Sequence, residues 1–224
     1  MSSDPAAKDP SWPAGFTAES ATTLVRGAAT LGVSLTAGDA ARLLQLLGEL
    51  ALWNRHTNLT AITEPDAMIT HHLLDSLAVH GDLHGTRILD AGTGAGFPGL
   101  PLALVNPGRQ FTLVDSTAKK IRFVTHAARV LGLDNVTALH ARVEQMHPEA
   151  PFDTVVARAF APLPKLLAQV RVVCGPATRV LAMKGRWPGD ELAALPAGWR
   201  VVSSRELAVP GLGAARCLIV LERA

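Results

Sequence analysis

The stretch Arg87-Ile88-Leu89-Asp90-Ala91-Gly92-Thr93-Gly94-Ala95-Gly96-Phe97-Pro98-Gly99 decides the fold of this chain. It predicts a short buried strand, then a glycine-rich turn, then a helix that begins near Pro98. Glycine is needed where the backbone takes a positive φ or lies directly against a ligand, and a helix N-terminus offers free N–H groups. A turn that only shaped the chain would lose backbone entropy at its glycines without a gain in packing. We therefore interpret the turn as a cradle for a ligand.

The spacing of the glycines separates two classes of cofactor. Dinucleotide sites prefer G-x-G-x-x-G around a pyrophosphate, whereas Gly92, Gly94 and Gly96 give G-x-G-x-G behind Asp90. This pattern resembles the first motif of S-adenosylmethionine (SAM) methyltransferases, in which the acid lies near the methionine end of the cofactor. A carboxylate is unfavourable beside a pyrophosphate and favourable beside an ammonium or sulfonium group. The motif therefore favours SAM as the cofactor.

A second apolar run, Phe111-Thr112-Leu113-Val114-Asp115, also ends in a carboxylate. In a βαβ unit the end of the second strand lies beside the end of the first, so Asp115 is predicted to accept hydrogen bonds from the ribose hydroxyls of an adenosine cofactor. A strand-ending Asp without a ligand is the alternative. The order of strand, glycine turn, helix, strand and acid favours the binding role.

Alternating strands and helices extend beyond this unit. Strands are expected near 87–90, 111–115, 135–139, 153–157 and 178–183, with helices at 98–105, 117–131 and 163–173. This alternation predicts a parallel sheet covered on both faces. Two further strands at 199–207 and 215–222 are typical of the antiparallel end of a methyltransferase sheet. We expect an α/β fold of class I SAM-dependent methyltransferases (Rossmann-like), with a mostly parallel seven-stranded sheet.

The N-terminal part predicts helices rather than strands. Residues 1–18 are expected to form a disordered tail, residues 19–80 a helical extension, and residues 81–224 the methyltransferase domain. Thr36, with Asp39 three residues on, predicts a helix start, and the helical period breaks at Asn54. A further helix is expected from Pro65 to about His80. On it His72, Asp75 and Ser76 share one face, which would contact a substrate, tie the helix to the main domain, or form a solvated side.

Composition limits the class of protein. With 224 residues and 48% hydrophobic content, the chain can bury a full core, and no apolar run has the length of a membrane-spanning helix. Cys174 and Cys217 lack metal-type spacing, so we expect no metal site and a reduced, cytoplasmic location. From Arg158 onward the sequence has 10 Lys/Arg against 4 Asp/Glu, whereas the preceding part has 11 against 15. This asymmetry indicates either a surface that binds a polyanion or a solvated basic face.

Several short motifs, taken together, resemble one family: the glucose-inhibited division B proteins, which are SAM-dependent guanine-N7 methyltransferases of small-subunit (16S) ribosomal RNA. The resemblance covers roughly residues 40 to 222. The matching pieces are Trp53-Asn54, Asn58-Leu59-Thr60, His72-Leu73-Leu74-Asp75-Ser76, the Asp90 to Gly99 stretch, Leu113-Val114-Asp115-Ser116, Arg142-Val143-Glu144, Arg158-Ala159 and Met183-Lys184-Gly185.

This resemblance implies roles for individual residues. Gly92 and Phe97 would line the cofactor, Asp115 would bind its ribose, and Val143 and Glu144 would contact its adenine. Arg158 would border both cofactor and substrate, and Lys184 and the final basic segment would face RNA. The chain departs from the family at Ala215-Arg216-Cys217-Leu218, where Glu-Arg-His-Leu is usual. Arg216 is retained, but no role of that acid or histidine transfers to this chain.

The chemistry implied by the family needs few catalytic groups. Guanine N7 already has an unshared in-plane electron pair, so no base must remove a proton, and orientation alone can supply about 7 to 11 kcal/mol. The fourth strand lacks the N/D-P-P-aromatic motif used for exocyclic amines. The candidate catalytic residues are Arg158 and Lys184: Arg158 would bind guanine O6 or a phosphate, or pair with Asp90 or Glu144, and Lys184 would bind phosphate.

The residues predicted to bind substrate RNA are His72, Asp75, Arg158, Lys184 and Arg216. The expected partner is 16S rRNA or the small ribosomal subunit, and the protein is expected to act as a monomer. Two other functions remain open, a SAM enzyme for a small molecule and a non-catalytic RNA- or nucleotide-binding module. Steep weakening of binding by salt would favour RNA, because phosphate contacts release counterions. An NAD-dependent dehydrogenase is disfavoured by the glycine spacing.

Overall fold

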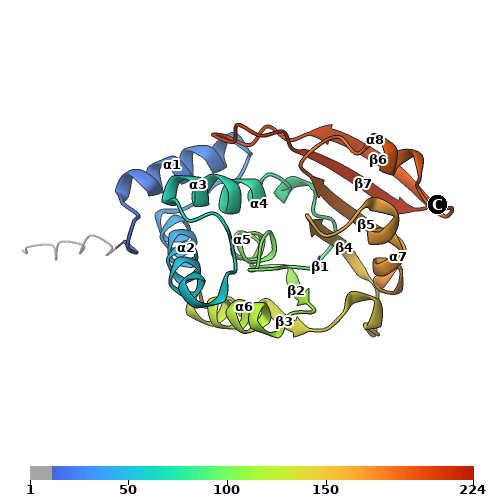
Figure 1. The fold of residues 1–224 in the computed structure, drawn as a ribbon, viewed down its shortest axis with the longest axis horizontal. Helices are drawn as coiled ribbons and strands as arrows, with labels where there is room; N and C mark the ends of the chain where they lie inside the picture. Colours follow the sequence, from blue (N-terminus) through green and yellow to red (C-terminus); the bar gives the residue numbers. More distant parts are fainter. Residues whose placement is uncertain (1–11) are drawn as a thin grey trace, which may run out of the picture.

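The computed structural model describes residues 12–224, which form a seven-stranded sheet with helices on both faces (Figure 1). The strand order is β3-β2-β1-β4-β5-β7-β6, and β7 runs opposite in direction to the other six strands. This confirms the predicted fold class, including the antiparallel end of the sheet. The strands are β1 (Arg87–Ala91), β2 (Gln110–Asp115), β3 (Val136–His140), β4 (Phe152–Arg158), β5 (Cys174–Lys184), β6 (Trp199–Glu206) and β7 (Cys217–Arg223).

The helices agree with the predicted ones, with three additions: a π-helical turn inside the third helix, the short helix α8, and three 3-10 turns. No helix within residues 12–224 is both long and apolar enough to cross a membrane. Residues 1–11 of the predicted disordered tail lie outside the described residues. For residues 12–18 the prediction is wrong, because Phe16 is buried in the core and Thr17 caps α1. The helices are α1 (Ala18–Thr30), α2 (Ala37–Thr57), α3 (Pro65–Met68), the π turn η1 (Ile69–Leu74), α4 (Asp75–Leu77), α5 (Gly99–Leu104), α6 (Ala118–Val130), α7 (Leu163–Val170) and α8 (Gly189–Ala193), with the 3-10 turns η2 (His80–Asp82), η3 (Val143–Gln145) and η4 (Arg171–Val173).

Helix α2 begins as predicted and ends later than predicted. The Thr36 side chain and Asp39 form a capping box, as the sequence indicated. The predicted break at Asn54 is wrong, because the helix continues to Thr57 and Asn58 closes it in the left-handed conformation, φ 48°. Asn54 stays helical while its side-chain oxygen accepts hydrogen bonds from the backbone N–H groups of the loop beyond, at Leu59 (2.6 Å) and Thr60 (2.9 Å). A polar residue in the last turn of α2 therefore organises the loop instead of ending the helix.

Alternate residues of each strand pack on opposite faces of the sheet. Ile88 belongs to the core under the N-terminal helices, α5 and α6, whereas its neighbour Leu89 belongs to the core under α7. Leu181 and Ala182 divide in the same way on β5. The seven-stranded sheet therefore separates two hydrophobic cores.

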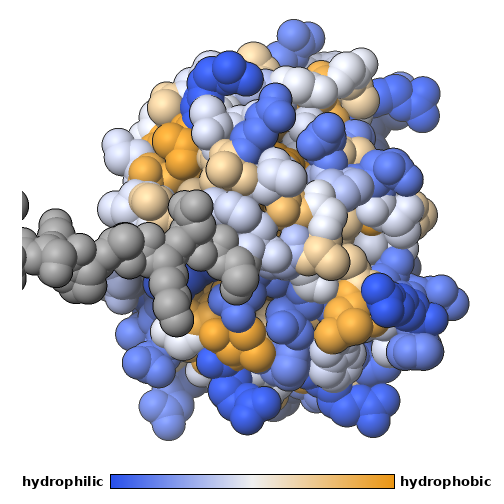
Figure 2. All heavy atoms as spheres, turned by 90° about the vertical axis from the view of Figure 1, so that its left-hand side faces the viewer, coloured by the Kyte–Doolittle hydropathy of each residue, from blue (hydrophilic) through white to orange (hydrophobic). Residues whose placement is uncertain are grey.

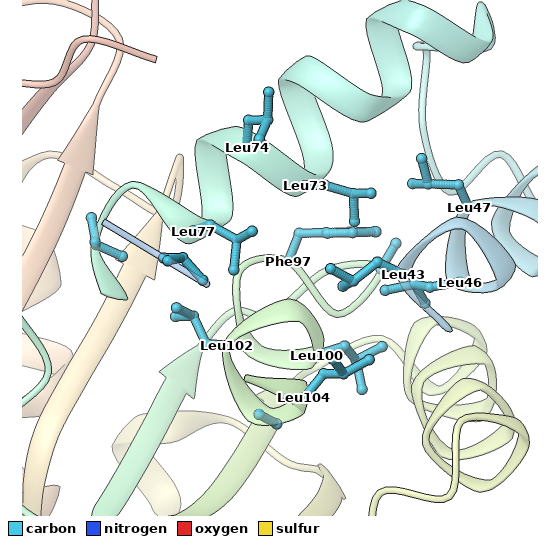
Figure 3. Packing of buried hydrophobic residues seen from close by; sticks show 14 of the residues in the cluster. Leu43, Leu46, Leu47, Leu73, Leu74, Leu77, Phe97, Leu100, Leu102 and Leu104 are labelled. Atoms are coloured by element: carbon cyan, nitrogen blue, oxygen red, sulfur yellow. The ribbon is translucent and has the colours of Figure 1, made fainter. Parts of the chain in front are cut away.

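The N-terminal helices share a core with the sheet rather than forming one of their own. Figure 3 shows leucines of α2 and of the 65–77 helix meeting Phe97 and the leucines of α5. On the face of the molecule that lies at the left of Figure 1, hydrophilic residues predominate on the surface and hydrophobic residues gather only in small separate groups (Figure 2). Residues 19–80 are thereby fixed against the glycine turn, which places His72 and Asp75 near the strand ends.

Candidate functional site

Strand β1 lies at the point where the sheet order reverses, because it pairs in parallel with β2 on one side and with β4 on the other. Ligands of open α/β sheets bind in the crevice outside the carboxyl ends of such strands. A cleft of about 310 Å³ opens there, and we call it the glycine-loop cleft. Its lining includes Gly92, Asp115, Thr117, Lys120, Val143, Glu144, Ala159, Phe160, Lys165 and Gln169.

The buried side chain of Asp90 fixes the conformation of the glycine turn through hydrogen bonds. Its Oδ2 accepts hydrogen bonds from the Thr93 hydroxyl (2.6 Å) and from the Gly99 backbone N–H at the start of α5 (2.9 Å). Its Oδ1 is buried and has no partner among the described residues, and burial raises the pKa of this carboxyl to about 6. Asp90 therefore shapes the turn with one oxygen and keeps an unpaired acceptor on the other.

The glycines of the turn adopt backbone conformations that other residues rarely take. Gly92, Gly94 and Gly96 have φ values of 69°, 60° and 87°. A side chain on Gly94 would point into open space, and one on Gly92 would collide with the ring of Phe160. The backbone of Gly94 is therefore open to a ligand, whereas the backbone of Gly92 is covered by the ring of Phe160.

Asp115 lies at the end of β2, as predicted, and faces the glycine-loop cleft. Its Oδ1 accepts from the Thr117 backbone N–H (2.9 Å), and its Oδ2 accepts from the Gly94 N–H (3.0 Å) and lies 3.4 Å from the Lys120 ammonium. An ionised carboxylate has about four acceptor positions. Asp115 is therefore fixed in orientation and retains acceptor capacity for a ligand hydroxyl.

Val143 and Glu144 lie in the 3-10 turn η3 after β3 and line the far end of the same cleft. Val143 is buried, whereas the Glu144 carboxylate lies near Arg142 (3.7 Å) and accepts a hydrogen bond from the Gln169 amide (3.4 Å). An apolar side chain next to a carboxylate suits a flat heterocycle that carries an amino group. The geometry thus brings together Gly92, Asp115, Val143 and Glu144, which the sequence singled out separately.

A second cavity, of about 360 Å³, adjoins the first, and we call it the arginine cavity. Ala159 lines both spaces, and this non-glycine residue has a positive φ of 49°. Strained backbone of this kind is concentrated at functional sites. The cavity is lined by Ile62, His71, His72, Asp75, Arg158, Ala159, Met183, Lys184, Gly185 and Arg216.

Asp75 binds two arginines inside this cavity. Its Oδ2 accepts from Arg158 Nη1 (2.9 Å) and its Oδ1 accepts from Arg216 Nε (3.0 Å). Arg158 Nη1 also donates to the His71 carbonyl (2.9 Å). The expectation that Arg158 pairs with Asp90 or Glu144 is wrong, because the 65–77 helix brings Asp75 closer. The solvated-side alternative for that helix is also wrong, since His72, Asp75 and Ser76 are buried.

His72 packs between the arginine cavity and the glycine turn. Its ring stacks on Phe97 with centroids 4.8 Å apart, and its Nε2 lies 3.0 Å from the Thr60 hydroxyl. Burial, and then the positive charge of Arg158, lower the pKa of His72 to about 3, so the ring is neutral at physiological pH. Phe97 is itself buried and contacts His72 rather than the open part of the cleft.

Lys184 lies at the end of β5 with its ammonium group bound inside the protein. It donates to the Ala161 carbonyl (2.8 Å) and pairs with Glu191 of α8 (2.7 Å), whose carboxylate also accepts from the Leu163 N–H. The Lys184 side chain is only 15% exposed. It therefore ties the loop after β4 to the loop after β5, next to the arginine cavity.

Arg216 stands in the segment that departs from the family pattern. Its neighbour Cys217 begins β7 and donates its thiol to the Arg186 carbonyl (3.3 Å). Cys174 and Cys217 are both buried and unbridged, and burial raises the pKa of Cys174 to about 12. No cluster of three or more metal-ligating side chains exists within residues 12–224.

Three residues support the site without having been predicted from the sequence to do so. Phe160 directly follows Arg158-Ala159 at the end of β4, and this position next to a recognised motif could have identified Phe160 as a site residue. Lys120 lies one helical turn into α6 after Asp115, and only a structure shows that it reaches that carboxylate. Thr60 belongs to a recognised motif, yet its contact with His72 joins residues twelve positions apart across a loop.

Comparison with known proteins gives a consistent match. The family model described as rRNA small subunit methyltransferase G (GidB) matches residues 39–220. A protein named ribosomal RNA small subunit methyltransferase G from Nitrosococcus oceani is 48% identical over 198 residues, which cover 88% of this chain and 92% of the relative. One of the same name from Pseudomonas paraeruginosa is 47% identical, covering 89% of this chain and 94% of the relative.

Solved structures with low sequence identity share the fold. A SAM-dependent methyltransferase from Geobacter sulfurreducens, in complex with S-adenosyl-L-homocysteine, superposes with a TM-score of 0.53 at 14% identity, covering 79% of this chain and 98% of that one. A SAM-dependent methyltransferase from Aquifex aeolicus gives 0.52 at 20% identity, covering 70% of this chain and 93% of that one. Both support the class I methyltransferase architecture seen in the sheet order.

Proposed function

The chain belongs to the rRNA small subunit methyltransferase G (GidB) family, and on that premise we propose that it transfers the methyl group of SAM to N7 of a guanosine in 16S rRNA. The observation that carries this proposal is the junction of two spaces at Ala159, the glycine-loop cleft and the arginine cavity. One space has the donors and acceptors of an adenosine site, and the other has paired arginines. Because the two spaces share Ala159, SAM bound in the cleft would present its methyl group toward a base bound in the arginine cavity.

The residues of the glycine-loop cleft fit SAM. The space over Gly94 is open for the cofactor, and Asp115 retains acceptor capacity for the ribose hydroxyls. The unpaired, buried Oδ1 of Asp90 is the kind of acceptor that a cationic amino-acid group satisfies. Val143 and Glu144 would contact the adenine. When bound, SAM supplies an electrophilic methyl group on a sulfonium centre.

The protein's contribution to the chemistry is orientation and exclusion of water. N7 of guanine attacks with its own electron pair, so no side chain has to act as a general base. Holding both reactants in attack geometry is worth about 7 to 11 kcal/mol in favourable cases. His72 is neutral and Lys184 is already paired, so neither adds an unpaired positive charge beside the sulfonium.

We assign guanine or phosphate binding to the arginines of the arginine cavity. The bonds to Asp75, the His71 carbonyl and the Ala215 carbonyl use only some of the five N–H donors that each guanidinium carries. The remaining donors of Arg158 and Arg216 suit guanine O6 or an RNA phosphate. Ile62, Ala159 and Met183 supply apolar surface for the base.

The excess of Lys and Arg in the C-terminal part is weaker support for an RNA partner than the number of these residues suggests. Six of its ten Lys/Arg side chains form ion pairs with carboxylates of this chain: Arg158, Arg179, Lys184, Arg200, Arg205 and Arg216. We therefore propose that the arginine cavity, rather than a broad basic face, carries the RNA contact. The proposed enzyme acts in the cytoplasm, where its substrate is found, and as a monomer.

A direct assay tests the proposal. The protein is incubated with methyl-labelled SAM and small-subunit RNA from a strain that lacks the corresponding gene, and the modified base is mapped. Naked 16S rRNA, a partial particle and the assembled subunit form three parallel arms. We expect labelled 7-methylguanosine at a single position in at least one arm. Absence of transfer in all three, or a label on another base atom, would refute it.

A further inference from the structure

We infer that Asp75 is a positioning residue for methyl transfer: it fixes the guanidinium groups of Arg158 and Arg216 on one wall of the arginine cavity. The inference rests on the proposed function and assigns Asp75 a different role from direct RNA binding. Only 1% of the residue is exposed, and both carboxylate oxygens already accept from the arginines. Because it is almost fully buried, the carboxylate presents almost no surface to a substrate, whereas the two arginine side chains line the cavity and are each about one-fifth exposed.

The three residues come from segments that only the tertiary fold brings together. Asp75 begins α4, Arg158 ends β4 and Arg216 immediately precedes β7, and the two hydrogen bonds span 83 and 141 residues. Asp75 follows the π turn η1, and its backbone N–H donates to the Thr70 carbonyl five residues back. Single π turns within helices are frequent at functional sites. Asp75 is thus the only side-chain link, among the described residues, that holds both arginines together.

The negative charge of Asp75 also matters for the two positive charges of Arg158 and Arg216. Two guanidiniums supply two planar sets of donors, but two positive charges would oppose both a sulfonium cofactor and a 7-methylguanosine product, which is itself cationic. The buried carboxylate of Asp75 offsets one of the two charges. The arginine cavity therefore offers two guanidinium edges at a net charge of about +1, and the partial rigidity of the ion pairs limits the entropy lost when a nucleotide binds.

Asp75→Asn tests this role, with Asp82→Asn as the matched control. Asp82 belongs to the same N-terminal segment and pairs with Arg205 at 2.7 Å, and neither residue lines the glycine-loop cleft or the arginine cavity. For Asp75→Asn we expect kcat/KM for rRNA to fall about 100-fold while the Kd for SAM changes less than about twofold. Asp82→Asn should leave both values unchanged. The wild-type assay comes first: if it shows no transfer, the proposed function fails, whereas normal transfer in Asp75→Asn overturns only this inference.

Two further variants separate positioning from a structural role. Asp75→Glu keeps the charge and the acceptors but displaces both guanidiniums by one methylene, so kcat should fall about tenfold in a protein that still unfolds in a single cooperative transition. In an Arg158→Ala/Arg216→Ala background, Asp75→Asn should change the residual kcat/KM less than about threefold, since its effect acts through the arginines. Wild-type kcat in Asp75→Glu, or an undiminished 100-fold effect without the arginines, would overturn the inference.

Discussion

The glycine-loop cleft and the arginine cavity adjoin at Ala159, yet they are built in different ways. The cleft is local: Asp90 binds Thr93 and Gly99 within nine residues, and Asp115 binds Thr117 and Gly94 within twenty-one. Most of its fixed contacts use backbone N–H groups. The arginine cavity is assembled from side chains that lie 83 and 141 residues apart and converge on one carboxylate.

This difference predicts how each space responds to change. A site made of backbone turns and strand ends depends on backbone conformation, so substitutions there should alter cofactor affinity. A site made of mutually paired side chains depends on each partner, so substitutions there should alter transfer and leave cofactor affinity unchanged. Substitutions in either space therefore test whether the two spaces act separately.

Gly94→Asp should have the largest effect. Gly94 has φ 60°, faces open space and donates to Asp115, which lines the cleft, so an aspartate there is strained, projects into the space proposed for the cofactor and repels the neighbouring carboxylate. We expect the Kd for SAM, measured by calorimetry, to rise more than about 1000-fold, with transfer abolished. Gly132→Asp is a matched control, because Gly132 has φ 59° and open space but lies at the end of α6. Normal SAM binding by the Gly94 variant would contradict the placement of the cofactor.

Arg158→Ala should lower kcat/KM for rRNA about 100-fold, as expected when a charged donor to substrate is removed. SAM affinity should remain within about twofold, because Arg158 lines the arginine cavity. Lys184→Ala should cost less than about tenfold, since that ammonium group is already satisfied by Glu191 and Ala161. A larger loss for Lys184→Ala than for Arg158→Ala would show that these roles are reversed.

The same contrast explains how much the sequence could predict. The glycine turn after β1, Asp115 at the end of β2 and the alternation of strands and helices follow local patterns, so the fold class and most of the glycine-loop cleft were predictable from residue spacing. The pairing of Arg158 with Asp75 was not, because periodicity places Asp75 on a helix face without saying what packs on that face. Family motifs marked Arg158, Asp75 and Lys184 as a set, but only the structure shows which of them contact one another.

His72→Gln should change the pH dependence of stability. The folded-state pKa of about 3 lies below the ordinary value of 6.5, so the folded protein binds fewer protons than the unfolded chain between these values. His72 therefore costs stability as pH falls below 6.5, by about 2 kcal/mol at pH 5. Asp90, with its pKa raised to about 6, acts in the opposite direction, losing stability as pH rises from about 4 to 6. Urea unfolding of wild type and variant at pH 5 and 8 isolates the His72 contribution.

A control fixes the interpretation of that experiment. His56 is exposed near the end of α2, so His56→Gln is the matched control for the loss of a histidine from the surface. If the unfolding free energy of His72→Gln changes with pH in parallel with that of wild type, the His72 ring is not buried in neutral form. The stacking of His72 on Phe97 between the two spaces would then need revision.

Asp115→Asn should have a much smaller effect on SAM affinity than Gly94→Asp, and it should test the separation of the two spaces most directly. Asn retains one oxygen, but its amide group faces either the Gly94 N–H or the Thr117 N–H, so one of these donors loses its acceptor. We expect the Kd for SAM to rise about tenfold, or about 1.4 kcal/mol, with Asp134→Asn on the exposed loop before β3 as the matched control. At saturating SAM, kcat should return to the wild-type value, because Asp115 does not face the arginine cavity. A lowered kcat that excess SAM fails to restore would mean that the cleft and the cavity act as one unit.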